Sequence, residues 1–297
     1  MIDKKQYKIA FLILHYQNID VTKKCINYLL RLNNIYNNYI VIIDNASPNG
    51  TGEIIKNMYC NKKNIHVICS KTNVGFSSGN NIGYIYAKNN LQVDVIVAMN
   101  SDVFINEVDF IKKMQNAISN NIEKYIIAPD IVVKNGYHQN PYMKEPISTE
   151  KQKKILIRKY MGYILYSIPF VGKKMISRKK IVEFQPNQKN KVKEPLLNIV
   201  PHGACVIYLP NWVNNENIAF IEGTFLFVEE ELLYDYCKAK GYSILYYPNL
   251  VVNHVEDASQ NLVNKNALEK KKNQLKYEIQ SRKLLLRRRS NTFKEGL

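Results

Sequence analysis

Acidic residues, paired cysteines and long apolar runs are all scarce in this sequence, and each scarcity excludes a class of protein. Asp and Glu number 25 against 42 Lys and Arg, so the net charge is +17 at neutral pH. This positive field favours anionic partners: nucleotides, nucleic acid or an anionic membrane surface. The five cysteines include no CxxC pair, which argues against a disulfide framework and a zinc site and predicts a reducing compartment.

No apolar stretch is long enough for a membrane-spanning helix, and the N-terminus lacks a signal-peptide pattern. We therefore expect a cytoplasmic protein, free or peripheral at the inner face of the cell membrane. Hydrophobic residues make up 46% of the 297 residues, enough to bury a sizeable core in one large domain or two small ones.

Several catalytic and binding signatures are also missing. The sequence contains no P-loop, no GxGxxG fingerprint and no GxSxG elbow, which argues against an NTPase, kinase, dehydrogenase or serine hydrolase. It also lacks RRM, KH, zinc-finger and helix-turn-helix signatures, which weakens a nucleic-acid-binding interpretation of the positive charge.

Apolar runs alternate with helical patterns over about the first hundred residues. Compact apolar runs at 8–15, 39–43, 65–69 and 93–99 predict buried strands, with amphipathic or turn-initiated helices between them. This alternation predicts an α/β fold with a mainly parallel sheet and right-handed crossovers.

Polar residues follow three of these strands directly. Asp44 and Asn45 end the second strand, the segment 73–81 follows the third, and Asn100 to Asp102 end the fourth. Ligands of open α/β sheets bind at the carboxyl ends of the strands, so these segments are candidates for a nucleotide site.

Three further features carry candidate chemistry. Asp102 is placed to hold a divalent cation against a diphosphate, although an aspartate after a strand also serves as a turn residue. The run from Glu229 to Glu231 opens a helix, where acidic residues complement the helix dipole, and one of them could act as a general base. His254 ends a strand-like run and is a metal-ligand candidate, with a structural histidine as the alternative.

The order of the motifs resembles the family 2 glycosyltransferases, in particular the rhamnosyltransferase-like branch that builds bacterial cell-surface polysaccharides. The resemblance covers about residues 8–112 and 196–290. Two positions depart from the family pattern, with His15 for an asparagine and Glu230 for an aspartate. The matching segments are Asp44-Asn45-Ala46-Ser47, Asn73-Val74-Gly75-Phe76, Gly79-Asn80-Asn81-Ile82-Gly83, Asn100-Ser101-Asp102, Gly203-Ala204-Cys205, Glu229-Glu230, His254 with Ser259, and Ser281-Arg282.

The resemblance implies a GT-A fold, a mixed, mainly parallel sheet flanked by helices, with a basic insertion and a helical C-terminal segment. It implies an inverting, metal-dependent transfer from a UDP- or dTDP-sugar to a glycan or polyprenyl-diphosphate-linked acceptor. Asp102 with His254 would hold Mg²⁺ or Mn²⁺, and Glu230 or its neighbour Glu229 would be the catalytic base. The donor site would include Asp44, Asn45, Asn73, Gly75, Asn81 and Asn100.

The expected organisation is a GT-A domain at 1–260, with a nucleotide-binding half at about 1–112 and an acceptor half at about 113–260, followed by a basic helical segment at 261–297. Residues 150–180 combine an apolar, aromatic stretch with flanking basic clusters. This pattern is typical of an interfacial amphipathic segment, and equally of an insertion that packs on the core with a solvated basic face.

Three alternatives stay open at this point. The Glu-for-Asp change and His15 are compatible with a catalytically impaired scaffold of the same fold. The net charge alone would suit a nucleic-acid-binding protein. A nucleotidyltransferase would need a glycine-rich phosphate loop, for which 46–51 is a poor substitute.

Overall fold

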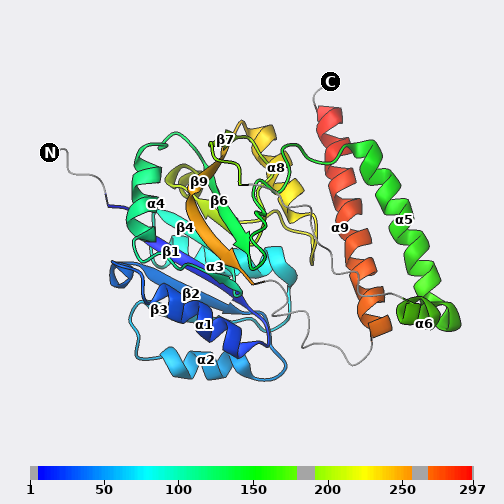
Figure 1. Ribbon diagram of the computed structural model, residues 1–297, viewed down its shortest axis with the longest axis horizontal. Coiled ribbons are helices and arrows are strands. Elements are labelled where there is room, and N and C mark those ends of the chain that lie inside the picture. Colours follow the sequence, from blue (N-terminus) through cyan, green and yellow to red (C-terminus); the bar gives the residue numbers. More distant parts are fainter. Residues whose placement is uncertain (1–5, 179–190, 256–266, 296–297) are drawn as a thin grey trace.

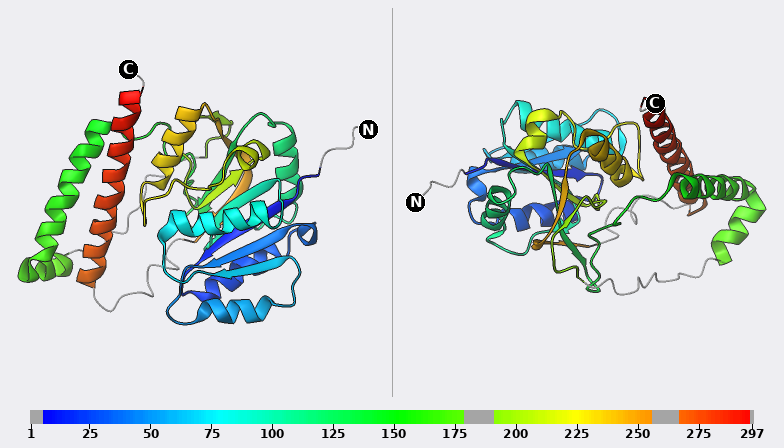
Figure 2. Two further views of the ribbon diagram at one scale, coloured as in Figure 1. Left: turned by 180° about the vertical axis from the view of Figure 1, so that it is seen from behind. Right: turned by 90° about the horizontal axis from the view of Figure 1, so that it is seen from above.

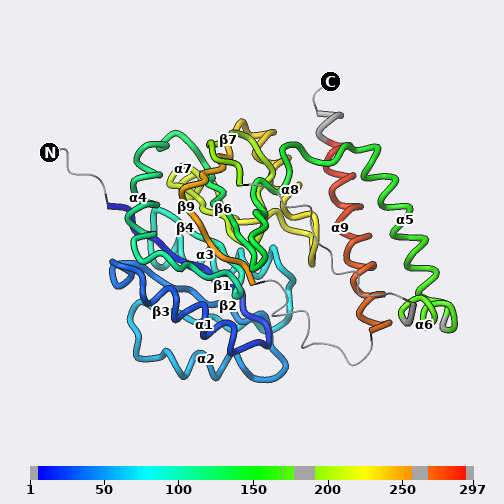
Figure 3. Tube along the Cα trace, viewed as in Figure 1, coloured from blue at the N-terminus to red at the C-terminus, as the bar shows by residue number. Residues whose placement is uncertain are grey.

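The computed structural model describes residues 6–178, 191–255 and 267–295. Ser259, which the sequence pairs with His254, lies outside these ranges. The described residues form an α/β body, and a lobe of three helices stands at its side (Figure 1). The N-terminal strands, in blue, belong to the body, and the last helix belongs to the lobe (Figure 3).

One mixed sheet runs through the body, with the described strands in the order β3-β2-β1-β4-β8-β6-β9-β5 and β7 paired to β9. The first four strands in this order are mutually parallel, and β8 then pairs antiparallel with β4. The strands are β1 Ile9–His15, β2 Tyr39–Asp44, β3 Ile65–Cys69, β4 Val95–Asn100, β5 Val103–Phe104, β6 Ile126–Val133, β7 Leu196–Leu197, β8 Cys205–Tyr208 and β9 Ile244–His254.

The parallel register brings the polar strand ends together. His15 of β1 pairs with Asp44 of β2, and Leu14 pairs with Asn100 of β4. The predicted α/β class with a mixed sheet is confirmed, and so is the expectation that the polar segments share one edge of the sheet.

Helices cover both faces of the sheet (Figure 2). One group packs against one face of the strands and a second group against the other, and the remaining three form the lobe. The first group is α1 Ile19–Leu29, α2 Thr51–Tyr59 and α4 Phe110–Ser119; the second is α3 Gly75–Asn89, α7 Pro210–Asn215 and α8 Glu229–Lys240; the lobe is α5 Thr149–Ser167, α6 Pro169–Arg178 and α9 Ala267–Glu295; a short 3-10 helix, η1, spans Ile35–Asn37.

The two cores follow from the alternation of side chains along each strand. Ile9, Phe11 and Ile13 of β1 face the α1 side, whereas Ala10 and Leu12 face the α3 side, and all five are fully buried. A strand covered on both faces must be apolar throughout, which is why β1 reads as a continuous hydrophobic run. Each large side chain buried there contributes roughly 1.5–3 kcal/mol.

In the lobe, α5 lies along α9 (Figure 1). Tyr166 of α5 is buried, Gly162 faces Leu275 of α9, and Lys159 forms an ion pair with Glu278. The basic middle segment therefore packs on the C-terminal helix rather than on the sheet. Among the described helices, none is long and apolar enough to cross a membrane.

A buried polar network joins the lobe to the start of α8. The Glu231 carboxylate accepts hydrogen bonds from Gln152 of α5 at 2.6 Å and from Arg289 of α9 at 3.1 Å. The Arg289 guanidinium also donates to Asp235 at 2.6 Å and to the Ile147 carbonyl at 2.7 Å. The side chains of Glu231 and Arg289 are only 5% and 10% exposed, so removal of either one would leave the other as a buried charge without its partner.

Replacing Arg289 with methionine should therefore destabilise the protein by about 3 kcal/mol, because the buried Glu231 carboxylate loses its counter-charge. Urea unfolding measures the loss. Arg287→Met, at an exposed position two residues away, is the matched control and should change stability by no more than about 0.5 kcal/mol. Equal stability of the two variants would contradict the network.

Candidate active site

A cleft of about 280 Å³ opens where the ends of β4 and β8 meet the start of α8. Chain segments distant in sequence form its wall, including one residue of the lobe. The residues that the argument uses are Asn100 after β4, Tyr142, His202 and Gly203 before β8, Glu229 and Glu230 of α8, and Arg282 of α9.

The backbone that presents the α8 carboxylates is unusual. Phe227 and Val228 both have left-handed backbones, with φ of 79° and 62°. Such a conformation is an outlier for a β-branched residue and persists only where the surroundings impose it. It turns the chain sharply into α8, so that Glu229 and Glu230 enter the helix facing the cleft.

The three consecutive glutamates have different environments. Glu231 is held by the lobe, as described above. Glu229 is 4% exposed, its Oε1 has no hydrogen-bond partner among the described residues, and burial together with the nearby Glu230 charge raises its pKa to about 8. Glu230 is half-buried beside the Gly203 amide, 3.4 Å from its Oε1, and burial raises its pKa also.

The loop before α8 is fastened to α3 by one buried amide. The Asn81 side chain accepts from the Ala219 and Phe220 amides at 2.8 and 2.9 Å. It donates to the Phe220 carbonyl at 2.9 Å and to Glu222 at 3.2 Å. All four hydrogen-bonding positions of the amide are thus used within the protein, and Asn81 acts on the site by holding this loop.

Gly75 lets the same loop approach α3 closely. Its φ is +82°, and a Cβ at this position would lie 2.5 Å from the Phe225 carbonyl oxygen. Phe76 donates its amide to that carbonyl at 2.8 Å. Any side chain at Gly75 would therefore push the 219–228 segment away from α3.

The other predicted donor-site residues gather at the ends of β1 and β2. Asp44 is nearly buried and accepts from the Ser47 hydroxyl and amide. The Asn45 amide bridges to the 73–75 turn, accepting from Val74 and donating to the Gly75 carbonyl. Asn73 accepts from the Gly75 amide at 3.0 Å, so Asn45 and Asn73 both shape this turn.

His15, the departure from the family pattern, is fully buried below this edge. Its Nδ1 pairs with the Thr22 hydroxyl at 2.7 Å and its Nε2 with the Thr51 hydroxyl at 2.9 Å. Burial lowers the pKa of the ring, which keeps it neutral near neutral pH. His15 thus ties β1 to α1 and α2 and leaves the cleft residues untouched.

The structure brings together the two predicted metal ligands. Nε2 of His254 lies 3.3 Å from the Asp102 carboxylate. Nδ1 of His254 pairs with the side-chain amide oxygen of Gln139 at 2.8 Å, which orients the ring with Nε2 towards the carboxylate. This outer hydrogen bond is typical of a metal-ligating histidine.

These residues fit a divalent cation bound mainly by a substrate. Magnesium sites commonly use one or two protein ligands, completed by phosphate oxygens and water. In keeping with this, no group of three or more His, Cys, Asp or Glu side chains among the described residues could hold a metal alone. The Asp102–His254 pair offers an oxygen and a nitrogen ligand and leaves the other positions to a diphosphate.

Sequence reasoning gave no role to two residues of this region. Tyr142 in the cleft wall and Gln139 behind His254 come from the 113–195 stretch, which carries no motif. His202 stands next to a recognised motif, since it precedes Gly203, and this adjacency could have marked it. Arg282 is itself part of the recognised Ser281-Arg282 segment, to which the sequence analysis gave no role.

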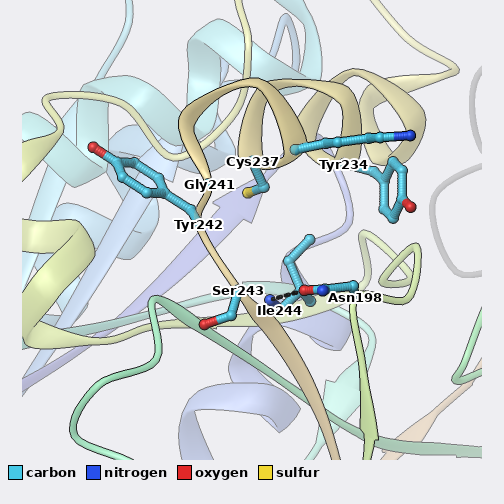
Figure 4. Close-up of a pocket in the computed structure, with 8 residues that line it drawn as sticks. Asn198, Tyr234, Cys237, Gly241, Tyr242, Ser243 and Ile244 are labelled. Carbon is cyan, nitrogen blue, oxygen red and sulfur yellow. Dashed lines mark hydrogen bonds between the residues drawn. The ribbon is translucent and has the colours of Figure 1, made fainter.

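A second hollow of about 240 Å³ lies at the other end of α8, between Tyr234, Gly241 and Asn198 (Figure 4). In it, the side-chain Oδ1 of Asn198 accepts from the Ile244 amide at 3.4 Å. The residues that line it include no carboxylate or imidazole, the groups that the predicted metal-binding and base roles require.

Comparison with known proteins decides the family. A family model described as glycosyl transferase family 2 matches residues 11–183, more than half of the chain. The chain belongs to glycosyl transferase family 2. A hexosyltransferase of low-salt glycan biosynthesis from Haloferax volcanii, Agl10, is similar to this family member over 100 residues at 31% identity, covering 34% of this chain and 30% of that protein.

Solved glycosyltransferases share the fold of this family 2 member. TarS of S. aureus with UDP-GlcNAc superposes with a TM-score of 0.54 at 15% identity, covering 91% of this chain and 66% of that chain. The mannosyltransferase PcManGT of Pyrobaculum calidifontis, with GDP-Man and Mn²⁺, gives 0.53 at 10% identity, covering 86% and 59%. GalNAc-T7 with UDP, GalNAc and Mn²⁺ gives 0.55 at 13% identity, covering 85% and 44%. The predicted GT-A fold is therefore confirmed.

Burial of Glu229 predicts a pH-dependent stability. Its pKa rises from 4.5 to about 8 on folding, so the folded state holds this proton more tightly than the unfolded chain. The resulting stability is fully present below pH 4.5 and is lost as the pH rises through about 8. Above pH 8, Glu229→Gln should therefore melt at least about 3 °C higher than the natural protein.

Melting curves across this pH range measure the effect. Glu194→Gln, at an exposed position, is the matched control and should follow the natural protein at every pH. A melting difference between Glu229→Gln and the natural protein that does not change with pH would show that folding does not raise the Glu229 pKa.

Proposed function

We propose that this protein is an inverting glycosyltransferase that moves a sugar from a UDP- or dTDP-sugar to a hydroxyl of a glycan or lipid-linked acceptor in surface polysaccharide synthesis. The observation that carries the proposal is the shared cleft. The half-buried carboxylate of Glu230 and the side chain of Asn100 line this cleft together. Asn100 lies two residues before Asp102 along the chain, and Asp102 pairs with His254.

The donor would lie along the carboxyl ends of β1, β2 and β4. Asp44 would contact the base or ribose, and Asn100 would contact the diphosphate side of the donor. Asn45, Asn73, Gly75 and Asn81 would act through the backbone they hold, since their polar groups bind the 73–75 turn and the 219–222 segment. The solved complexes of similar fold hold UDP-GlcNAc or GDP-Man, which supports a nucleotide-sugar donor.

Asp102 and His254 would hold Mg²⁺ or Mn²⁺. The cation would stabilise negative charge on the leaving diphosphate as the bond to the sugar breaks. Gln139 would keep the His254 ring in the tautomer whose Nε2 is free to bind.

Glu230 would be the general base. It lines the cleft with an exposed edge, and its position beside the Gly203 amide fixes its orientation. It would take the proton of an acceptor hydroxyl, whose oxygen then attacks the anomeric carbon as the nucleotide leaves. Glu229 holds its own proton near neutral pH and would limit the negative charge beside the base.

The excess of basic residues suits an acceptor held at an anionic membrane surface at the inner face of the cell membrane. A polyprenyl-diphosphate-linked glycan would present its diphosphate in that plane. The same positive field would draw nucleotide donors towards the cleft.

Nucleotide binding should depend on Asp102. One of UDP, dTDP or GDP, added with Mn²⁺, should raise the melting temperature by several degrees, because a ligand of the folded state stabilises it by mass action. Asp102→Ala should abolish the metal-dependent part of the shift, whereas Asp20→Ala, at an exposed position, should retain it. The absence of a shift with every nucleotide in the folded protein would contradict the donor site and favour a scaffold.

Removal of the base should separate Glu230 from Glu229. With the nucleotide-sugar whose nucleotide binds, Glu230→Gln should lower the turnover by about a hundredfold or more, because general base catalysis is lost. Glu229→Gln should stay within about tenfold of the natural protein. Release of nucleoside diphosphate measures both rates, and the reverse order would assign the base to Glu229.

A further inference from the structure

The outer face of α5 and the start of α6 expose a stripe of large apolar side chains. Phe170 is 88% exposed, and Ile157, Met161 and Ile164 are each close to 60% exposed. The spacing of the α5 residues, Leu165 included, places them on one side of the helix, because residues three, four, seven and eight apart share a face. We call this stripe, from Ile157 to Phe170, the α5–α6 tip.

The opposite side of α5 is the one that packs on α9. Gln152, Lys159 and Tyr166 are buried or paired there, and Gly162 faces Leu275. The α5–α6 tip therefore points away from the rest of the described chain. In the right-hand view of Figure 2, α6 lies at the outermost side of the lobe, on the side away from the sheet.

Basic residues flank the tip on both sides. Lys153, Lys154 and Arg158 are exposed on α5 immediately before and beside the stripe, and Lys173 and Lys174 are exposed on α6 after it. Within α5 and α6 the sequence carries one acidic residue, Glu150. We call these five basic residues the basic collar. Apolar side chains that insert into lipid and basic residues that attract anionic head groups are the two features that hold a peripheral protein on an anionic bilayer.

We propose that the α5–α6 tip inserts into the head-group region of an anionic lipid bilayer and holds the protein there. A second copy of this chain fits the tip less well, because a symmetric contact would bring the two basic collars together. Nucleic acid would meet the cations but would leave the apolar stripe in water. The bilayer satisfies both features at once.

This docking also relates the membrane to the cleft, and in this respect it rests on the proposed function. The lobe that carries the tip contributes Arg282 to the cleft wall and binds Glu231 next to the proposed base. Docking of the lobe would therefore hold the cleft near the surface that carries a lipid-linked acceptor, because the lobe and the start of α8 are joined by these contacts.

The test is sedimentation of the full chain with vesicles of phosphatidylcholine, with and without about a quarter of phosphatidylglycerol. We expect binding to the anionic vesicles and little to the neutral ones. Phe170→Asp should weaken anionic-vesicle binding by about tenfold, and the double variant Lys153→Glu with Lys154→Glu by tenfold or more. Salt at about 1 M should weaken the vesicle binding of the natural protein strongly but not completely, because the apolar part of the attraction persists.

Tyr36→Asp is the matched control, since Tyr36 is 76% exposed on the α/β body, and it should bind vesicles like the natural protein. Unchanged binding of both tip variants would overturn the proposal. A chain that ignores vesicles and is a dimer, with Phe170→Asp a monomer, would overturn it in favour of a subunit interface. Metal-dependent nucleotide binding, measured on the same Phe170→Asp protein without vesicles, should persist, so failure of membrane docking is distinguishable from failure of the donor site.

Discussion

The buried side-chain amide of Asn81 is the contact on which the geometry of the cleft depends. Its four hydrogen bonds hold residues 219–222 against α3. From there, the chain has few residues in which to reach α8, and it does so through the left-handed pair Phe227 and Val228. A backbone so unfavourable for valine persists only where its surroundings impose it, and two contacts hold the chain that leads into it. Asn81 holds residues 219–222, and the Ser281 hydroxyl of α9 donates to the Leu226 carbonyl.

The three glutamates at the start of α8 show how neighbouring residues of one type take different tasks. Helical geometry points successive side chains about 100° apart, so one turn can face the lobe, the core and the cleft in succession. Glu231 pairs with a guanidinium and is structural, burial and the nearby Glu230 charge raise the pKa of Glu229, and Glu230 stays half-buried in the cleft wall. Charge repulsion within the turn is limited because Glu231 is neutralised by Arg289 and Glu229 holds a proton.

The sequence predicts the parallel, N-terminal part of the sheet well because each buried parallel strand is a short, continuous apolar run. The limits of α8 were also readable, from the acidic start at Glu229 to Gly241, whose φ of 71° ends the helix. The sequence did not show that the side chains of Asn45 and Asn81 bind the protein's own backbone, because an asparagine that binds backbone and one that binds a ligand look identical in sequence. The pairing of α5 with α9 was hidden for another reason: both helices are rich in lysine and arginine, and their packing surface is identified only when they are placed together.

The arrangement of Glu231 has a further consequence for cooperativity. Its carboxylate belongs to α8, and the groups that neutralise it belong to α5 and α9. Detachment of α9 would leave the Glu231 carboxylate buried without a counter-charge. Local unfolding of the lobe alone therefore has a high free-energy cost. Helices α5 and α9 therefore unfold locally together with the start of α8. The α5–α6 tip and the cleft keep or lose their order together.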